Sequence, residues 1–207
     1  MKRTIAYIDG FNLYYGALKG TPYKWLDLRK LCQGLLDQTH QIDAIKYYTA
    51  LINARSNDPT QPQRQQVYLR AIGTDPLVKV VLGHFLQHEV VRPLASDPET
   101  YVRVIKTEEK GSDVNLATDL VHDAHRGLFD AALVISNDSD LKEPVRIVRR
   151  ELGLIVGVVN PGSGRASRVL TQDATFVKTI RSGLLRDSLL PGRLTDDRGT
   201  ISRPANW

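Results

Sequence analysis

The sequence predicts an α/β fold in which strands alternate with helices, so that a mainly parallel sheet is covered by helices on both faces. Three observations lead to this fold class. Short β-rich apolar runs recur along the chain, and segments with apolar residues at helical spacing separate them. A length of 207 residues with 42% hydrophobic content is also enough for one substantial core. Strands that are connected through helices pair in parallel.

The N-terminal half is expected to contribute three strands and two helices. Residues 4–8 form a short β-rich run that ends at Asp9. Residues 25–36 carry leucines at helical spacing, and Asp27 is a suitable N-cap. The remaining elements of this half are, in order, a strand at 44–52, an exposed helix at 61–72 and a strand at 77–82.

The C-terminal half begins with a turn-rich connection at 93–100, followed by an alternating edge strand at 101–105 and a polar loop at 106–112. Residues 113–125 place their apolar side chains on one helical face. The elements that follow are a strand from 131 that stops at Ser136, a helix at 141–152, a strand at 154–159 and a short helix within 169–180.

The chain is expected to form one domain over residues 1–180, followed by a basic tail at 181–207. From Lys178 onward the sequence has six basic residues and three acidic ones, within a segment rich in Gly, Pro, Arg and Asp. Chain ends are often poorly ordered unless something ties them down. We therefore expect a loosely attached tail.

Composition limits the class of protein. The formal charge of +5 and the pI of about 9.3 are compatible with a polyanionic partner without identifying one. Cys32 is the single cysteine, so an internal disulfide is excluded, and no signal-peptide h-region precedes the first strand. A cytoplasmic protein is the expectation. No apolar stretch approaches the roughly 20 residues that cross a bilayer, so membrane insertion is not expected.

Acidic residues follow the ends of two predicted strands and open one helix. Asp9 follows the first strand, Asp138 and Asp140 follow the strand that stops at Ser136, and Asp113 opens the helix leading into that strand. The ends of parallel strands open into one crevice, so these side chains are expected to converge. Converging carboxylates repel one another unless a cation lies between them. Oxygen ligands without cysteine favour Mg²⁺ or Mn²⁺.

Each acid also has a simpler explanation. Asp9 begins a common turn dipeptide, and Asp113 lies in the first turn of a helix for which Ser112 is a natural N-cap. Asp140 and Glu143 have the spacing of a capping box. The sequence pattern by itself leaves capping and metal binding both open.

Two histidine pairs offer another metal hypothesis. His84 and His88 are four residues apart, and His122 and His125 are three apart, so either pair fits one helical face. No further ligand set accompanies them at a zinc spacing, which favours structural or surface roles.

Three stretches in a fixed order, 9-DGFN-12, 110-KGSDVNLATDL-120 and 134-VISNDSDL-141, resemble the NYN family of the PIN-like nuclease superfamily, specifically its bacterial LabA-like branch. The resemblance covers about residues 3–180. It implies a Rossmann-like three-layer α/β/α sandwich. It also implies a ribonuclease site that uses a divalent metal, Mg²⁺ or Mn²⁺.

The same resemblance assigns roles to residues of this chain. Asn12 is implied as a catalytic residue that positions a water or a phosphate oxygen, although a helix cap is an equally good role. Asp119 ranks lower because its offset from Asp113 turns it around the helix. Many PIN-like proteins carry a further acid before this helix, for which we assign no residue. The implied metal-binding and catalytic acids are Asp9, Asp113, Asp138 and Asp140.

Single-stranded RNA is the expected partner, because unpaired strands enter a crevice and stack on aromatic side chains. Phe11, Tyr14 and Tyr15 follow Asp9 closely enough to provide such stacking, or else they pack on the sheet. Solvated loop charges are the alternative role for the basic candidates. The expected substrate contacts are Lys110, Ser136, Asn137, Arg165 and Arg168.

The leading hypothesis is therefore a metal-dependent endoribonuclease. A catalytically weak RNA- or protein-binding module and a PIN-type toxin are the alternatives, and a homo-oligomer is compatible with each. An enzyme of this kind requires a divalent ion for turnover. Binding through a basic tail survives chelation and weakens steeply with salt.

Overall fold

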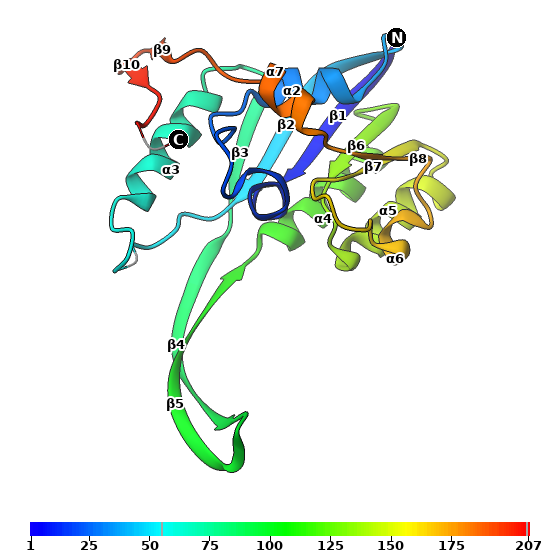
Figure 1. Cartoon of the computed structure of the whole chain (residues 1–207). Coiled ribbons are helices and arrows are strands. Elements are labelled where there is room, and N and C mark those ends of the chain that lie inside the picture. Colours follow the sequence, from blue (N-terminus) through cyan, green and yellow to red (C-terminus); the bar gives the residue numbers. More distant parts are fainter. Residues whose placement is uncertain (55, 206) are drawn as a thin grey trace.

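A computed structural model describes residues 1–54, 56–205 and 207. Its centre is a six-stranded sheet in the order β3-β2-β1-β6-β7-β8, and all five neighbouring pairs are parallel (Figure 1). These strands are β1 (Lys2–Asp9), β2 (His40–Thr49), β3 (Val78–Leu82), β6 (Ala131–Ile135), β7 (Ile155–Asn160) and β8 (Phe176–Thr179).

Helices connect and cover these strands. The α-helices are α1 (Gly10–Leu13), α2 (Leu28–Leu35), α3 (Gln61–Ile72), α4 (Ser112–His125), α5 (Lys142–Arg146), α6 (Arg168–Thr171) and α7 (Ser182–Asp187). Two π-helical segments, η1 (Tyr14–Leu18) and η3 (Ile147–Glu151), continue α1 and α5, and a short 3₁₀ turn, η2 (Ser139–Leu141), precedes α5. Within the described residues, no helix is long and apolar enough to span a membrane.

Alternate residues of the central strands enter two separate cores. Ala6 and Ile8 of β1 pack in one core with α2 and α3, whereas Ile5 and Tyr7 pack in the other with α4 and the α5–η3 segment. This alternation follows from the two-residue period of a strand. Because both faces of the sheet are apolar, both are covered. The expected three-layer α/β fold with a parallel sheet is thereby confirmed.

A long antiparallel hairpin leaves this body as an arm (Figure 1). It consists of β4 (His84–Leu94) and β5 (Asp97–Lys110), and no residue of either strand is buried. The expected turn-rich connection at 93–100 and the polar loop at 106–112 are therefore wrong, since both belong largely to the hairpin. Charged residues on both faces of an exposed ribbon remove the alternating pattern that identifies a strand. His84 and His88 consequently lie on a strand, not on a helix.

The C-terminal segment is attached to the body, contrary to the expectation of a loose tail. The Trp25 indole Nε1 donates a 2.8 Å hydrogen bond to the Pro191 carbonyl, and Arg70 pairs with Asp196 at 2.5 Å. Ile201 is buried in the core that contains Trp25. The segment includes α7 and a small hairpin of β9 (Arg193–Asp196) and β10 (Gly199–Ser202).

Candidate functional site

The site lies where the strand order reverses. From β1 the chain continues to β2 and β3 on one side, while β6, β7 and β8 extend on the other side. In open parallel sheets, the crevice for a ligand forms at this switch point, beyond the strand ends. Asp9 is the last residue of β1, and Asp138 follows β6 at the same edge. The two acids are thus brought together as the sequence predicted.

Asp9 is buried and held by three hydrogen bonds. Its Oδ1 accepts from the Asn12 backbone N–H at 2.9 Å, which makes Asp9 the N-cap of α1. Its Oδ2 accepts from Asn12 Nδ2 at 2.7 Å and from the Ser136 hydroxyl at 3.0 Å. Burial, followed by the charge of Asp138, raises the pKa of Asp9, although the hydrogen bonds oppose this shift. Asp9 therefore caps α1 and also forms part of the site.

The two asparagines connect the site to the loop that follows β7. Asn12 Oδ1 accepts from the Asn137 backbone N–H at 3.2 Å. The Asn137 side chain in turn donates to the Arg165 carbonyl at 3.3 Å and accepts from the Ser167 N–H at 2.6 Å. Both ends of each amide are therefore engaged within the protein. Asn12 and Asn137 hold the crevice in shape.

Asp138 caps the turn that follows β6. Its Oδ1 accepts from the Asp140 N–H at 3.0 Å, and its own N–H donates to the Ser136 hydroxyl at 3.1 Å. The capping box suggested by Asp140 and Glu143 does not form, because Asp138 is the N-cap and Glu143 binds Arg146. Asp140 is left exposed at the rim of the crevice.

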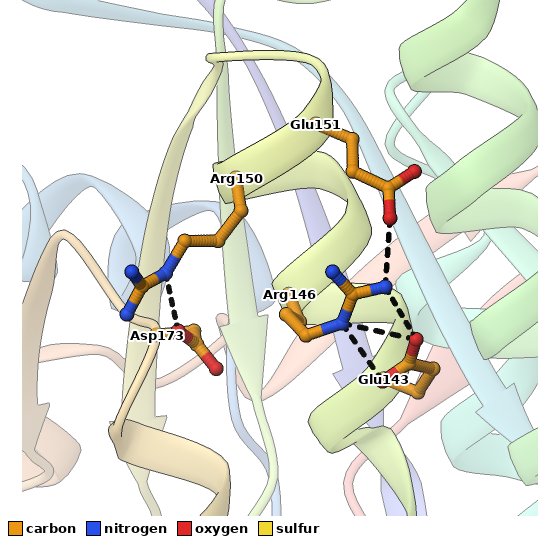
Figure 2. Close-up of polar contacts among 5 residues, drawn as sticks. All are labelled: Glu143, Arg146, Arg150, Glu151 and Asp173. Atoms are coloured by element: carbon orange, nitrogen blue, oxygen red, sulfur yellow. Dashed lines mark hydrogen bonds and ion pairs between the residues drawn. The ribbon is translucent and has the colours of Figure 1, made fainter.

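The helix behind this turn is fixed by ion pairs. Figure 2 shows Arg146 between two carboxylates, 2.6 Å from Glu143 and 2.7 Å from Glu151. The Arg150 Nε lies 2.6 Å from the buried Asp173 carboxylate, which joins η3 to the segment after α6 (Figure 2). These pairs account for Glu143 as a structural residue.

Asp113 and Glu109 complete the acidic wall. Together with Asp9 and Asp138 they line one cavity of about 510 Å³ between α1 and the base of the arm. The pKa of Asp113 is raised to about 6, first by partial burial and then by the charges of Asp9, Asp138, Glu109 and Asp140, in that order. Repulsion of this kind is the electrostatic signature of converging carboxylates.

Sequence reasoning missed Glu109, and the arm explains why. Phe85 and Glu109 are opposite residues of β4 and β5 and both line the cavity. Glu109 also accepts from the Ser112 N–H at 3.1 Å and from its hydroxyl at 2.7 Å, at the start of α4. Only a strand assignment for residues 106–110 reveals which of the consecutive acids at 108 and 109 faces the crevice.

Lys110 does not join the site. Side chains alternate along a strand, so Lys110 lies on the opposite face of the arm from Glu109. There its Nζ is 3.4 Å from Glu108, and it does not line the acidic cavity. The expected substrate contact from Lys110 is therefore unsupported, because the residue was assigned to a loop in which no alternation applies.

The other expected substrate contacts have different placements. Ser136 is completely buried and uses its hydroxyl on Asp9 and Asp138, so it has no surface for a substrate. Arg165 and Arg168 are exposed on the segment that Asn137 holds beside the crevice.

Asp119 belongs to a separate polar network beneath the sheet. Lys46 Nζ lies 2.6 Å from Asp123 Oδ2 and 3.2 Å from Asp119 Oδ2. The hydroxyls of Tyr7 and Tyr48 donate to Asp123 and Asp119 at 2.7 and 2.8 Å, respectively. Asp119 therefore joins α4 to the sheet, in agreement with its lower rank as a site residue.

The acids suit a hydrated divalent cation. Within the described residues, no three His, Cys, Asp or Glu side chains stand close enough to enclose an ion directly. Mg²⁺, however, usually keeps several waters and binds through one or two carboxylates. Asp113 and Asp138 line the cavity with oxygen donors only, and a cation there relieves the repulsion that raises the Asp113 pKa.

The parallel fold and its acid-lined crevice are those expected of an NYN domain. The chain belongs to this family, because the model of the NYN domain matches residues 3–180. The suspected family is thereby confirmed, and the LabA-like branch stays a prediction.

Two relatives extend the comparison. The chain is similar to 6-hydroxy-3-succinoylpyridine 3-monooxygenase HspA of Pseudomonas putida (strain DSM 28022 / S16), with 34% identity over 237 aligned residues, 99% of this chain and 75% of that protein. It is also similar to the crystal structure of a protein of unknown function, VPA0982, from Vibrio parahaemolyticus RIMD 2210633. That likeness has a TM-score of 0.55 at 20% identity, covers 91% of this chain and 96% of the other, and concerns the fold alone.

Proposed function

We propose that this protein is a divalent-metal-dependent endoribonuclease that hydrolyses phosphodiester bonds in single-stranded RNA. The observation that carries the proposal is the gathering of Asp9, Asp113, Asp138 and Glu109 around one cavity at the switch point. Burial and then the charges of Asp9, Asp138, Glu109 and Asp140 raise the pKa of Asp113, and the charge repulsion favours a cation among these acids. Membership of the NYN family supports a nuclease-like function.

The residues divide into ligands and supports. When bound, Mg²⁺ or Mn²⁺ supplies a water of lowered pKa and stabilises charge on the attacking and leaving oxygens. Asp113 and Asp138 are the proposed direct ligands, and Asp140 orients a water at the rim. Asp9 already accepts three hydrogen bonds, so it acts through its charge and through water. Asn12 is a positioning residue, because it holds Asp9.

The walls of the crevice suit a single strand of RNA. Phe11 of α1 meets Phe85 of β4 edge to face at 5.9 Å and closes the cavity on the arm side. The ring of Tyr15 is 53% exposed beside it and offers a stacking surface for a base. Arg165 and Arg168 are exposed on the segment that Asn137 holds, and we propose that they contact phosphates there and so position the strand.

The test is cleavage of a labelled single-stranded RNA by the wild type and by Asp138→Asn, each in Mn²⁺, Mg²⁺ or EDTA. We expect cutting that depends on the metal and falls by about a hundredfold or more in the variant. Asp197→Asn, an exposed acid outside the crevice, is the matched control and is expected to cut like the wild type.

The outcomes separate the hypotheses. RNA that is bound in EDTA but never cut favours the binding module, and growth arrest on expression favours the toxin. Equal cutting by Asp138→Asn and the wild type rejects the proposed site.

A second candidate function rests on the similarity to HspA, which spans 99% of this chain. On that view the protein is an oxygenase for a hydroxypyridine. Consumption of 6-hydroxy-3-succinoylpyridine in the presence of O₂ and a reductant, by a preparation that does not cut RNA, would establish it in place of the nuclease.

A further inference from the structure

A second, smaller cavity adjoins the acidic one. It has a volume of about 140 Å³ and lies between the α1–η1 segment, the end of β2 and α3. Both cavities are lined by Phe11, Tyr15, Ile52 and Gln61, so the two adjoin across these residues. Between Asp9 of the large cavity and Phe11 stands Gly10, at which a Cβ would lie only 2.7 Å from the Tyr47 ring. The smaller cavity therefore lies next to the one that the carboxylates line.

Aromatic rings form its walls. Tyr47 and Tyr68 are buried, with ring centroids 6.4 Å apart and nearly perpendicular planes. Trp207 closes the cavity, with its ring 5.5 Å from that of Tyr68. Flat faces and edges of this kind favour another planar ring. A cavity of roughly 150 Å³ accepts one benzene-sized ring, so a single ring fits and a fused pair does not.

The walls also carry polar groups that suit ring heteroatoms. Within the described part of the chain, the Tyr47 hydroxyl has no hydrogen-bond partner, although the residue is only 6% exposed. Thr49 and Lys24, two polar residues, also line this cavity. The Arg64 side chain also lines it, and its buried Nε lacks a partner among the described residues. An apolar cavity with a few convergent polar groups is the usual form of a small-ligand site.

We infer that this cavity binds one planar six-membered nitrogen heterocycle, and that in RNA this ring is a pyrimidine base next to the bond that is cut. The source of the ring depends on the proposed function, because a base reaches this cavity only if the RNA backbone lies along the carboxylates. A free hydroxypyridine acid presents the same ring chemistry. The protein thus prefers uracil or cytosine over adenine or guanine at this position.

The test is to measure the binding of three probes to the protein in EDTA by titration calorimetry. The probes are UMP, AMP and 6-hydroxynicotinate. We expect UMP to bind at least about tenfold more tightly than AMP, because the second ring of adenine exceeds the cavity. Tyr47→Phe keeps the wall and removes the unpaired hydroxyl, so it is expected to weaken UMP binding about three- to tenfold. Tyr101→Phe, on the exposed arm, is the control and leaves binding unchanged.

A second variant tests the cavity even if the Tyr47 hydroxyl contributes little to UMP binding. Ile52→Trp adds bulk at a residue that lines both cavities and is expected to abolish the preference for UMP over AMP. Equal binding of UMP and AMP by the wild type, or unchanged binding of UMP by both variants, overturns the inference. Binding of 6-hydroxynicotinate without UMP keeps the ring site and overturns RNA as its source.

Cleavage of poly(U) and poly(A) in Mn²⁺ separates this inference from the nuclease proposal. Cutting of both polymers at equal rates leaves the nuclease standing and rejects the pyrimidine site. Preferential binding of UMP without cutting of either polymer retains the ring site and rejects the nuclease.

Discussion

The hydroxyl of Ser136 donates a 3.0 Å hydrogen bond to Asp9 across the junction of β1 and β6. The same oxygen accepts the Asp138 N–H at 3.1 Å, so one buried atom sets the spacing of two acids that are distant in sequence. Neither strand alone determines this spacing. It arises only when the two strands pair in the observed register.

Ser136→Ala is expected to lower metal-dependent cleavage about 10- to 100-fold. The substitution removes the hydroxyl that supports Asp138 but leaves the proposed metal ligand itself in place. It also leaves the partly buried Asp138 N–H without this acceptor, at a cost of about 1 kcal/mol in the free energy of unfolding. Ser139→Ala, at an exposed neighbouring serine, is the control. Unchanged kinetics in Ser136→Ala would show that the spacing of the acids does not depend on this hydroxyl.

Asp113→Asn is expected to stabilise the metal-free protein at neutral pH. The pKa of Asp113 is about 6 in the folded state against an ordinary 3.8, so the folded state binds this proton more tightly. The resulting stabilisation is complete below about pH 4 and is lost as the pH rises through 6, above which the charged form is unfavourable. Since the side chain is exposed, solvent screening limits the gain in the variant to about 1 kcal/mol.

Urea unfolding in EDTA at about pH 4 and pH 8 measures this effect. Asp113→Asn should exceed the wild type in stability only at the higher pH, and a separate assay in Mn²⁺ at that pH should show that it has lost cleavage. A variant that is less stable than the wild type at the higher pH would mean that the carboxylates do not repel one another.

Glu109→Gln is expected to lower both RNA cleavage and the pKa of Asp113, because it removes a negative charge that faces the same cavity. Glu108→Gln is a close control, since Glu108 lies on the other face of the arm and pairs with Lys106 and Lys110. Titration of the Asp113 carboxyl by NMR distinguishes the two variants. Identical behaviour of the two glutamates would place Glu109 outside the site.

Lys46→Met is expected to destabilise the fold by about 3 kcal/mol or more, because Asp123 and Asp119 lose their cation beneath the sheet. Lys79 lies beside Lys46 in the register of β3 and is exposed. Lys79→Met should therefore change stability by no more than about 0.5 kcal/mol. Equal midpoints of urea unfolding for the two variants would show that the buried network contributes nothing.

Much of the fold was accessible from sequence because apolar periodicity and strand order determine it. The helix expected at 61–72 has those bounds in the structure, and the strand ends at Asp9 and Ser136 were located within a residue. The convergence of Asp9, Asp113 and Asp138 followed from parallel topology alone.

The sequence predictions that are wrong concern features that depend on contacts between distant segments. The C-terminal segment is held by a few apolar anchors such as Leu185 and Ile201, scattered among charges, so its sequence resembles that of a free tail. Glu109 was hidden because the arm has no buried face to set a pattern. Ser136 is expected to contact the substrate but is buried, because no sequence signal reveals which polar residue at a strand end is enclosed.

The exposed arm is expected to be less stable than the body of the protein. A two-stranded hairpin without a covering layer is only marginally stable, whereas β1 and β6 lie in the middle of the sheet. Amide hydrogens of β4 and β5 should therefore exchange by local opening long before those of the body. Yet Phe85 and Glu109, at the base of this arm, form one wall of the crevice. The width of the crevice is accordingly governed by the part of the protein that opens most easily.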